Sequence, residues 1–99
     1  MINVLVTMEV KDFTQLAAFE SKAVQVMHYH GGVMVRAFEV KRYDDGTGQE
    51  VHLLEFPSLE AFDEYRSNPL LLEYAELRCK AIDSTVVVIS SVSKDYSEK

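Results

Sequence analysis

Two short apolar runs with the composition of β-strands most constrain how this 99-residue chain can fold. In the first run, alternate residues from Ile2 to Met8 form one apolar face, while Leu5 adds an apolar side chain to the other face. In the last run, the residues at 86–89 are continuously apolar. A strand with one face in water alternates apolar and polar residues, so we expect both faces of this sheet to be buried.

The segment between these runs switches between helical and strand patterns. Apolar residues recur at three- and four-residue steps from Leu16 to Met27, which predicts a helix that starts after the N-cap Asp12 and stops at Gly31-Gly32. The other expected elements are strands over 2–9, 33–43, 50–56 and 85–92, a turn over 44–48, a helix beginning at 57–58, and a helix from Asn68-Pro69 to about Ile82.

The resulting order is β-α-β-β-α-β, which is the ferredoxin-like α+β fold with a four-stranded antiparallel sheet and the helices on one face. We expect a single domain over 1–93 and a polar C-terminal tail over 94–99. Because the helices cover only one face of the sheet, the other face is expected to pack on a second copy, giving a homodimer. A helix from a partner protein is the alternative.

Composition excludes several classes of partner. The chain is 47% hydrophobic and 26% charged, with a net charge of −6, so we expect a globular protein that does not bind nucleic acid or an anionic membrane. No apolar run approaches the roughly 20 residues that span a bilayer. The start of the chain has no signal-peptide pattern, and the single cysteine, Cys79, cannot form an internal disulfide. These features predict a cytoplasmic protein.

Several short motifs resemble those of a known family. They are Asp12-Phe13, then His30-Gly31-Gly32-Val33-Met34-Val35-Arg36, then Glu55-Phe56-Pro57-Ser58, followed by Ala61, Tyr65, Pro69 and Arg78. Together they resemble a family of small uncharacterised proteins in the dimeric α/β-barrel superfamily. The resemblance implies a dimeric α/β barrel, a fold also used by cofactor-free monooxygenases, muconolactone isomerases, haem-degrading enzymes and chlorite dismutases. Fold alone therefore does not fix function.

The histidines at 28 and 30 look at first like a metal motif. On a helix they point about 160° apart, so they cannot chelate one ion, and we expect no metal site. His30 lies on the core-facing stripe at the helix end, where a histidine is favourable beside the helix dipole. It is also a candidate acid or base at the mouth of a cavity. Haem ligation by His30 or His52 is a further, weaker alternative.

Two arginines occupy apolar faces. Arg78 falls inside the apolar arc of its expected helix, and Arg36 is expected to share a strand face with Met34 and Phe38. A guanidinium in such a place needs a partner. Either each arginine pairs with a carboxylate such as Glu55 or Glu39 or extends its charged end to the edge of the apolar surface, or one or both bind a small anionic or carbonyl-bearing ligand.

We therefore predict a pocket between sheet and helices that is lined by His30, Arg36, Tyr65, Tyr74 and Arg78. The candidate ligand-binding residues are Arg36, Tyr65, Tyr74 and Arg78, and the catalytic candidates are His30, Arg36 and Arg78. No cofactor is expected, because no phosphate loop, nucleophile elbow or paired-cysteine motif is present. The hypotheses are a cofactor-independent oxygenase or isomerase acting on a small aromatic or lactone-like compound, and a non-catalytic dimer that binds or senses a small ligand.

Overall fold

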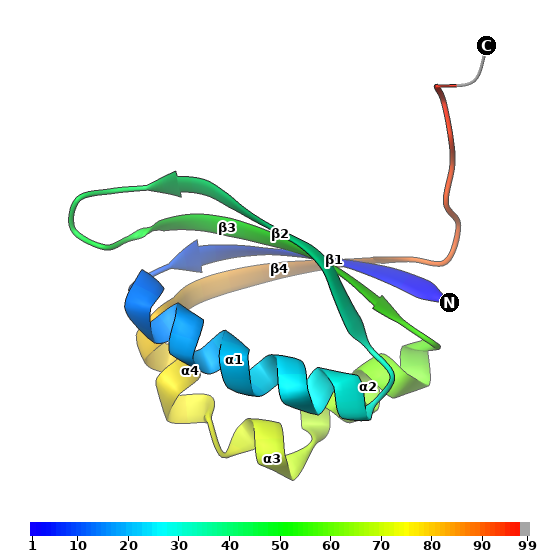
Figure 1. Cartoon of the computed structure of the whole chain (residues 1–99), viewed down its shortest axis with the longest axis horizontal. Coiled ribbons are helices and arrows are strands. Elements are labelled where there is room, and N and C mark those ends of the chain that lie inside the picture. Colours follow the sequence, from blue (N-terminus) through cyan, green and yellow to red (C-terminus); the bar gives the residue numbers. More distant parts are fainter. Residues whose placement is uncertain (98–99) are drawn as a thin grey trace.

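The computed structural model describes residues 1–97 and has one antiparallel sheet with all the helices on one face, in the order β-α-β-β-α-β (Figure 1). The strands are β1 (Ile2–Val10), β2 (Val33–Arg42), β3 (Gly48–Phe56) and β4 (Ile82–Ser90), and the helices are α1 (Phe13–Tyr29), α2 (Leu59–Ser67), α3 (Pro69–Leu72) and α4 (Ala75–Ala81). The spatial order of the strands is β2-β3-β1-β4. The predicted ferredoxin-like fold is confirmed.

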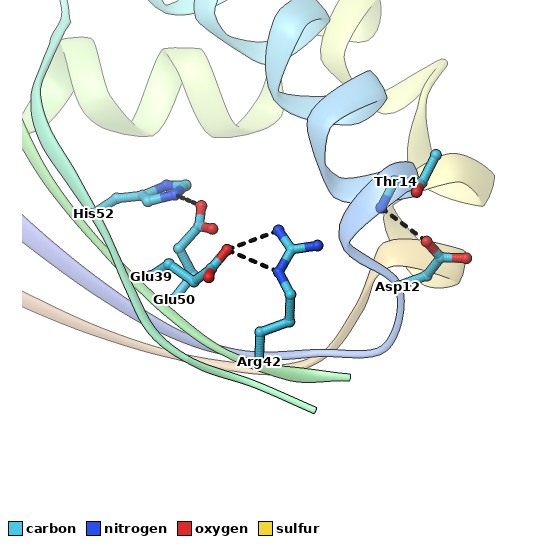
Figure 2. A network of polar contacts seen from close by, with 6 residues as sticks. All are labelled: Asp12, Thr14, Glu39, Arg42, Glu50 and His52. Atoms are coloured by element: carbon cyan, nitrogen blue, oxygen red, sulfur yellow. Dashed lines mark hydrogen bonds and ion pairs between the residues drawn. The ribbon is translucent and has the colours of Figure 1, made fainter. Parts of the chain in front are cut away.

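Local signals set the ends of the helices. The Asp12 carboxylate accepts from the backbone N–H of Thr14 at 2.9 Å and of Gln15 at 3.1 Å, so it caps α1 as predicted (Figure 2). At the other end of α1, Gly31 has φ +77°, a backbone conformation in which glycine is unstrained. Ser58 caps α2 by accepting from Ala61 N–H at 3.1 Å. Caps on both helices thus fix where the chain turns toward the sheet.

Several expected boundaries differ from the structure, and the two largest differences lie in the last third of the chain. The helix predicted from Pro69 to about Ile82 is broken into α3 and α4, and Tyr74 serves as the N-cap residue of α4. Strand β4 begins at Ile82 rather than 85, because pairing with β1 extends to Val10 across a bulge. The tail expected over 94–99 has no helix or strand through residue 97, and its last two residues lie outside the described range.

The two faces of the sheet have different environments. On the helix side, β1 and β3 contribute Val4, Met8, Leu54 and Phe56 to a buried core that also includes Phe62 of α2. The opposite side, called here the outer sheet face, is also apolar. It carries Leu5, Val33, Phe38, Val51, Leu53, Val86 and Val88, most of which are exposed in the single chain. Within residues 1–97, no helix combines the length and apolar character needed to cross a membrane.

Candidate functional site

A cavity of about 390 Å³ lies between the sheet and the helices. Its walls are mainly apolar and come from both layers: Val6, Met8, Phe19, Met27, Met34, Leu54, Phe62, Leu71, Leu72, Ala75, Ile82 and Val87. The polar lining residues are Glu20, His52, Tyr65, Arg66, Arg78, Cys79 and Thr85. An apolar cavity of this size with a few polar groups is typical of a small-molecule site.

His52 is the polar centre of this cavity. It lies on the helix side of β3, opposite Val6 of β1 and Ala37 of β2, and it is only 3% exposed. Its Nε2 is 2.6 Å from Oε2 of Glu50, two residues earlier on the same strand face (Figure 2). An ionised carboxylate only accepts hydrogen bonds, so Glu50 keeps a proton on Nε2. In the neutral imidazole, Nδ1 is then the atom that can accept a proton.

A second carboxylate faces Nδ1. Oε2 of Glu20, on α1, is 3.9 Å from His52 Nδ1. Burial raises the pKa of Glu20, and the nearby Glu50 raises it further, whereas His52 and Arg78 act in the opposite direction. Glu20 and His52 thus lie within ion-pair distance of each other at the cavity, and Glu50 contacts the other nitrogen of the imidazole ring.

Tyr65 of α2 and Arg78 of α4 bring hydrogen-bond donors to the same cavity. Tyr65 is 8% exposed, and burial raises the pKa of its hydroxyl, as does the charge of Glu20, so the phenol stays neutral. Arg78 makes one weak contact, from Nη2 to Thr85 Oγ1 at 3.5 Å. Both residues were predicted to lie at the pocket, and both do.

Arg36 does not line this cavity. Met34 pairs with Leu54 on the helix side, but the register shifts at Val35, so Arg36 pairs with Leu53 on the outer sheet face. The expectation that Arg36 and Met34 share a face is wrong because a β-bulge inserts an extra residue between them. Whether Arg36 binds a ligand stays a prediction, but it cannot do so together with Arg78 in one cavity of this chain.

His30 and Tyr74 also lie away from the cavity. His30 is the C-cap residue of α1, and its Nε2 is 2.8 Å from Asn68 Nδ2, which fits the helix-end interpretation. Tyr74, the N-cap residue of α4, lines a separate hollow between α1 and the α3 region. In the described part of the chain, no three His, Cys, Asp or Glu side chains are grouped so that they could hold a metal ion.

Glu20 and Glu50 were not among the site residues predicted from the sequence, although the position of each on an apolar stripe indicates a buried carboxylate. Glu20 follows Leu16 by four residues and precedes Ala23 by three, so it lies on the buried stripe of α1. Glu50 and His52 alternate on a strand face that continues into buried Leu54 and Phe56. A polar residue on an otherwise apolar stripe needs a partner, and here these residues are partners of one another.

Other proteins share this fold. RPA0582, a protein of unknown function from Rhodopseudomonas palustris, has a TM-score of 0.76 at 19% identity, over 95% of this chain and 83% of that one. Atu4242 from Agrobacterium tumefaciens has a TM-score of 0.70 at 20% identity, over 95% of each chain. SnoaB from Streptomyces nogalater, a cofactor-independent oxygenase, has a TM-score of 0.67 at 12% identity, over 98% of this chain and 97% of that one. Identities this low show the fold alone.

A comparison of the sequence with curated proteins finds no match. A comparison with protein families finds one. Residues 3–92 match the family model described as a domain of unknown function, DUF1330. The match spans all the helices and the whole sheet except Ile2, and it agrees with the resemblance to a family of small uncharacterised proteins. The chain therefore belongs to the DUF1330 family and has the ferredoxin-like fold.

Proposed function

We propose that this protein is a small-molecule enzyme that works by proton transfer in the cavity between sheet and helices. The observation that carries the proposal is the buried imidazole of His52, held between Glu50 at 2.6 Å and Glu20 at 3.9 Å where it meets an apolar cavity. A carboxylate behind one ring nitrogen leaves the other nitrogen poised as a base. This is an arrangement for moving a proton to and from a bound molecule.

The reaction classes that fit are an isomerase or an oxygenase that needs no bound cofactor, acting on a small aromatic or lactone-like compound. An isomerase removes a proton from one carbon and returns it to another. A cofactor-independent oxygenase removes a proton to form an electron-rich anion, which then reduces dioxygen directly. Both start with proton abstraction, for which the Glu20–His52 pair is the candidate base. SnoaB, which shares the fold, is described as a cofactor-independent oxygenase, and this supports the second class.

Arg78 and Tyr65 supply the hydrogen-bond donors that stabilise the anion formed when the proton is removed. A guanidinium and a neutral hydroxyl donate hydrogen bonds to a developing negative oxygen, and such bonds are stronger inside a water-poor cavity than in water. The apolar walls exclude water from the rest of the ligand. We propose Arg78 and Tyr65 as ligand-binding residues and Glu20 with His52 as the catalytic pair.

The working molecule is proposed to be a homodimer that packs through the outer sheet face. Phe38 is 53% exposed, Val86 62% and Val88 55%, an extent of apolar exposure that marks an interaction surface. Two such sheets facing each other would bury these side chains and give the dimeric form for which the superfamily is named. The free, exposed Cys79 supports a reducing, cytoplasmic setting.

A non-catalytic binding or sensing protein is the second candidate. It is favoured by the engagement of the His52 ring, whose Nε2 is already bound to Glu50 and whose Nδ1 faces Glu20. Haem binding has less support, since Nε2 of both His30 and His52 already has a hydrogen-bond partner.

Thermal-shift screening with aromatic acids and lactones, followed by deuterium exchange, separates these functions. Each stabilising compound is incubated with the protein in aerated deuterium oxide and then weighed by mass spectrometry. An enzyme of the proposed kind incorporates deuterium or oxygen, and Glu20→Gln abolishes this, whereas the exposed control Glu64→Gln does not. Stabilisation with no mass change would establish the binding protein instead, and no stabilisation by any compound would overturn the proposal.

A further inference from the structure

Three polar side chains in the cavity make no hydrogen bond shorter than 3.5 Å within residues 1–97. In the described part of the chain, the Tyr65 hydroxyl makes no hydrogen bond, the Glu20 carboxylate has its 3.9 Å contact with His52, and the Arg78 guanidinium has its 3.5 Å contact with Thr85. Within residues 1–97, no buried side-chain nitrogen or oxygen is left unsatisfied, so the Tyr65 hydroxyl is accessible, and Tyr65 lines the cavity. These groups are therefore available to a ligand.

The three groups differ in whether they need a hydrogen-bond acceptor or a donor from the ligand. Arg78 and the neutral Tyr65 hydroxyl are donors, so they call for an oxygen acceptor, and the guanidinium favours an anionic one. Glu20, when ionised, only accepts, so it calls for a hydroxyl or another donor. Glu20, Tyr65 and Arg78 all line the same cavity of about 390 Å³, so one small molecule bound there can meet groups of both kinds.

The remainder of the cavity restricts the body of the ligand. Its walls include Phe19 and Phe62 and the thioethers of Met8, Met27 and Met34. Aromatic rings and polarisable sulfur pack favourably against another aromatic ring. A flat apolar body thus suits the cavity better than a sugar or a free amino acid, whose many polar groups would find no partners there.

We propose that the cavity takes a small aromatic compound with a hydroxyl next to a carboxylate or carbonyl group, its carbonyl oxygen toward Arg78 and Tyr65 and its hydroxyl toward Glu20. This inference rests on the proposed function of the cavity and names its ligand class. Within that function, the hydroxyl proton passes to the Glu20–His52 pair, and the negative charge that forms is delocalised through the ring onto the carbonyl oxygen that Arg78 and Tyr65 hold.

Calorimetric titration of the full chain with salicylate, benzoate and phenol tests the ligand class. Salicylate offers both the hydroxyl and the carboxylate, benzoate only the carboxylate, and phenol only the hydroxyl. Salicylate is expected to bind about tenfold or more tightly than either of the others, as one added hydrogen bond to a charged group predicts. This comparison uses the unmodified protein, so it stands even if a variant fails to fold.

Variants then assign each contact. Arg78→Gln is expected to weaken salicylate and benzoate by about tenfold while leaving phenol unchanged. Lys80→Gln, an equal change of charge on the exposed side of the same helix, is expected to leave all three unchanged. Glu20→Gln is expected to remove the preference for salicylate over benzoate, whereas Glu64→Gln keeps it.

The possible failures are distinct. Equal binding of salicylate and benzoate by the unmodified protein, or an Arg78→Gln effect no larger than that of Lys80→Gln, would overturn the ligand class and leave the cavity function standing. If none of the three compounds binds, and the aromatic acids and lactones of the thermal-shift panel fail too, both the ligand class and the proposed function are wrong.

Discussion

Replacing Glu20 with glutamine is expected to remove a pH-dependent loss of stability. Burial raises the pKa of Glu20 above its ordinary value of 4.5, and Glu50 of β3 adds to this, while His52 of β3 and Arg78 of α4 oppose it. A carboxyl group with a higher pKa in the folded state binds more protons there than in the unfolded state. Its stabilising effect is therefore complete below the unfolded pKa and is lost as pH rises through the folded pKa. Glutamine has no such transition.

The size of the effect follows from linkage. One proton contributes a slope of at most about 1.4 kcal/mol per pH unit, and the total loss is about 1.4 kcal/mol for each unit by which burial raises the pKa. In a domain of about 100 residues, 1 kcal/mol shifts the melting temperature by roughly 4–8 °C. The variant should therefore gain on the unmodified protein as pH rises, by an amount that thermal melts resolve.

Urea unfolding of both proteins at several pH values from about 4 to 8 measures this difference. The free energy of unfolding of Glu20→Gln minus that of the unmodified protein is expected to increase with pH and then level off. The other carboxylates titrate in both proteins and largely cancel in the difference. Exposed Glu64→Gln supplies the control and should give a flat difference. A flat or falling difference for Glu20→Gln would refute the assignment of Glu20 as a buried carboxyl with a raised pKa.

Three further changes have defined outcomes. Gly32→Ala places a methyl group 2.5 Å from Phe56 Cζ and 2.7 Å from Met27 Cγ, both fully buried, so overpacking should cost about 1–3 kcal/mol in urea unfolding; an unchanged midpoint would contradict this. Asp12→Ala removes the α1 cap and should cost about 1 kcal/mol, which Asp12→Asn should largely restore. Val88→Asp puts a charge on the outer sheet face and should convert the proposed dimer to a monomer, as measured by sedimentation. If the unmodified protein is itself monomeric, the dimer proposal is wrong.

Most of the fold was predictable because its determinants are local. The helical stripe of α1, the Asp12 cap and the glycines at its end lie within a short stretch, and each has one common structural meaning. The apolar character of both sheet faces was likewise visible in the run at 86–89. Pattern and structure agree wherever a residue's role depends mainly on its immediate neighbours in sequence.

The candidate site was only partly predictable. Tyr65 and Arg78 were expected at the pocket and line it, since their own helices place them on its side. Arg36 was expected beside them, but a bulge at Val35 places it on the opposite face of the sheet. A bulge depends on how β2 pairs with β3, and nothing within the β2 sequence specifies it. Tyr74 was also expected at this pocket, but it stands at the break between α3 and α4 and lines the separate hollow against α1.

By itself, the sequence determined the order of elements, the N-caps at which α1 and α2 begin, and the presence of polar residues on buried stripes. Only the tertiary structure decided that three of these polar residues lie together. They are Glu20 of α1 and the two β3 residues Glu50 and His52. The physical reason is that periodicity fixes which face of an element a side chain occupies. The register and packing of other elements decide what that face meets, and at His52 they join two carboxylates to one imidazole beside an apolar cavity.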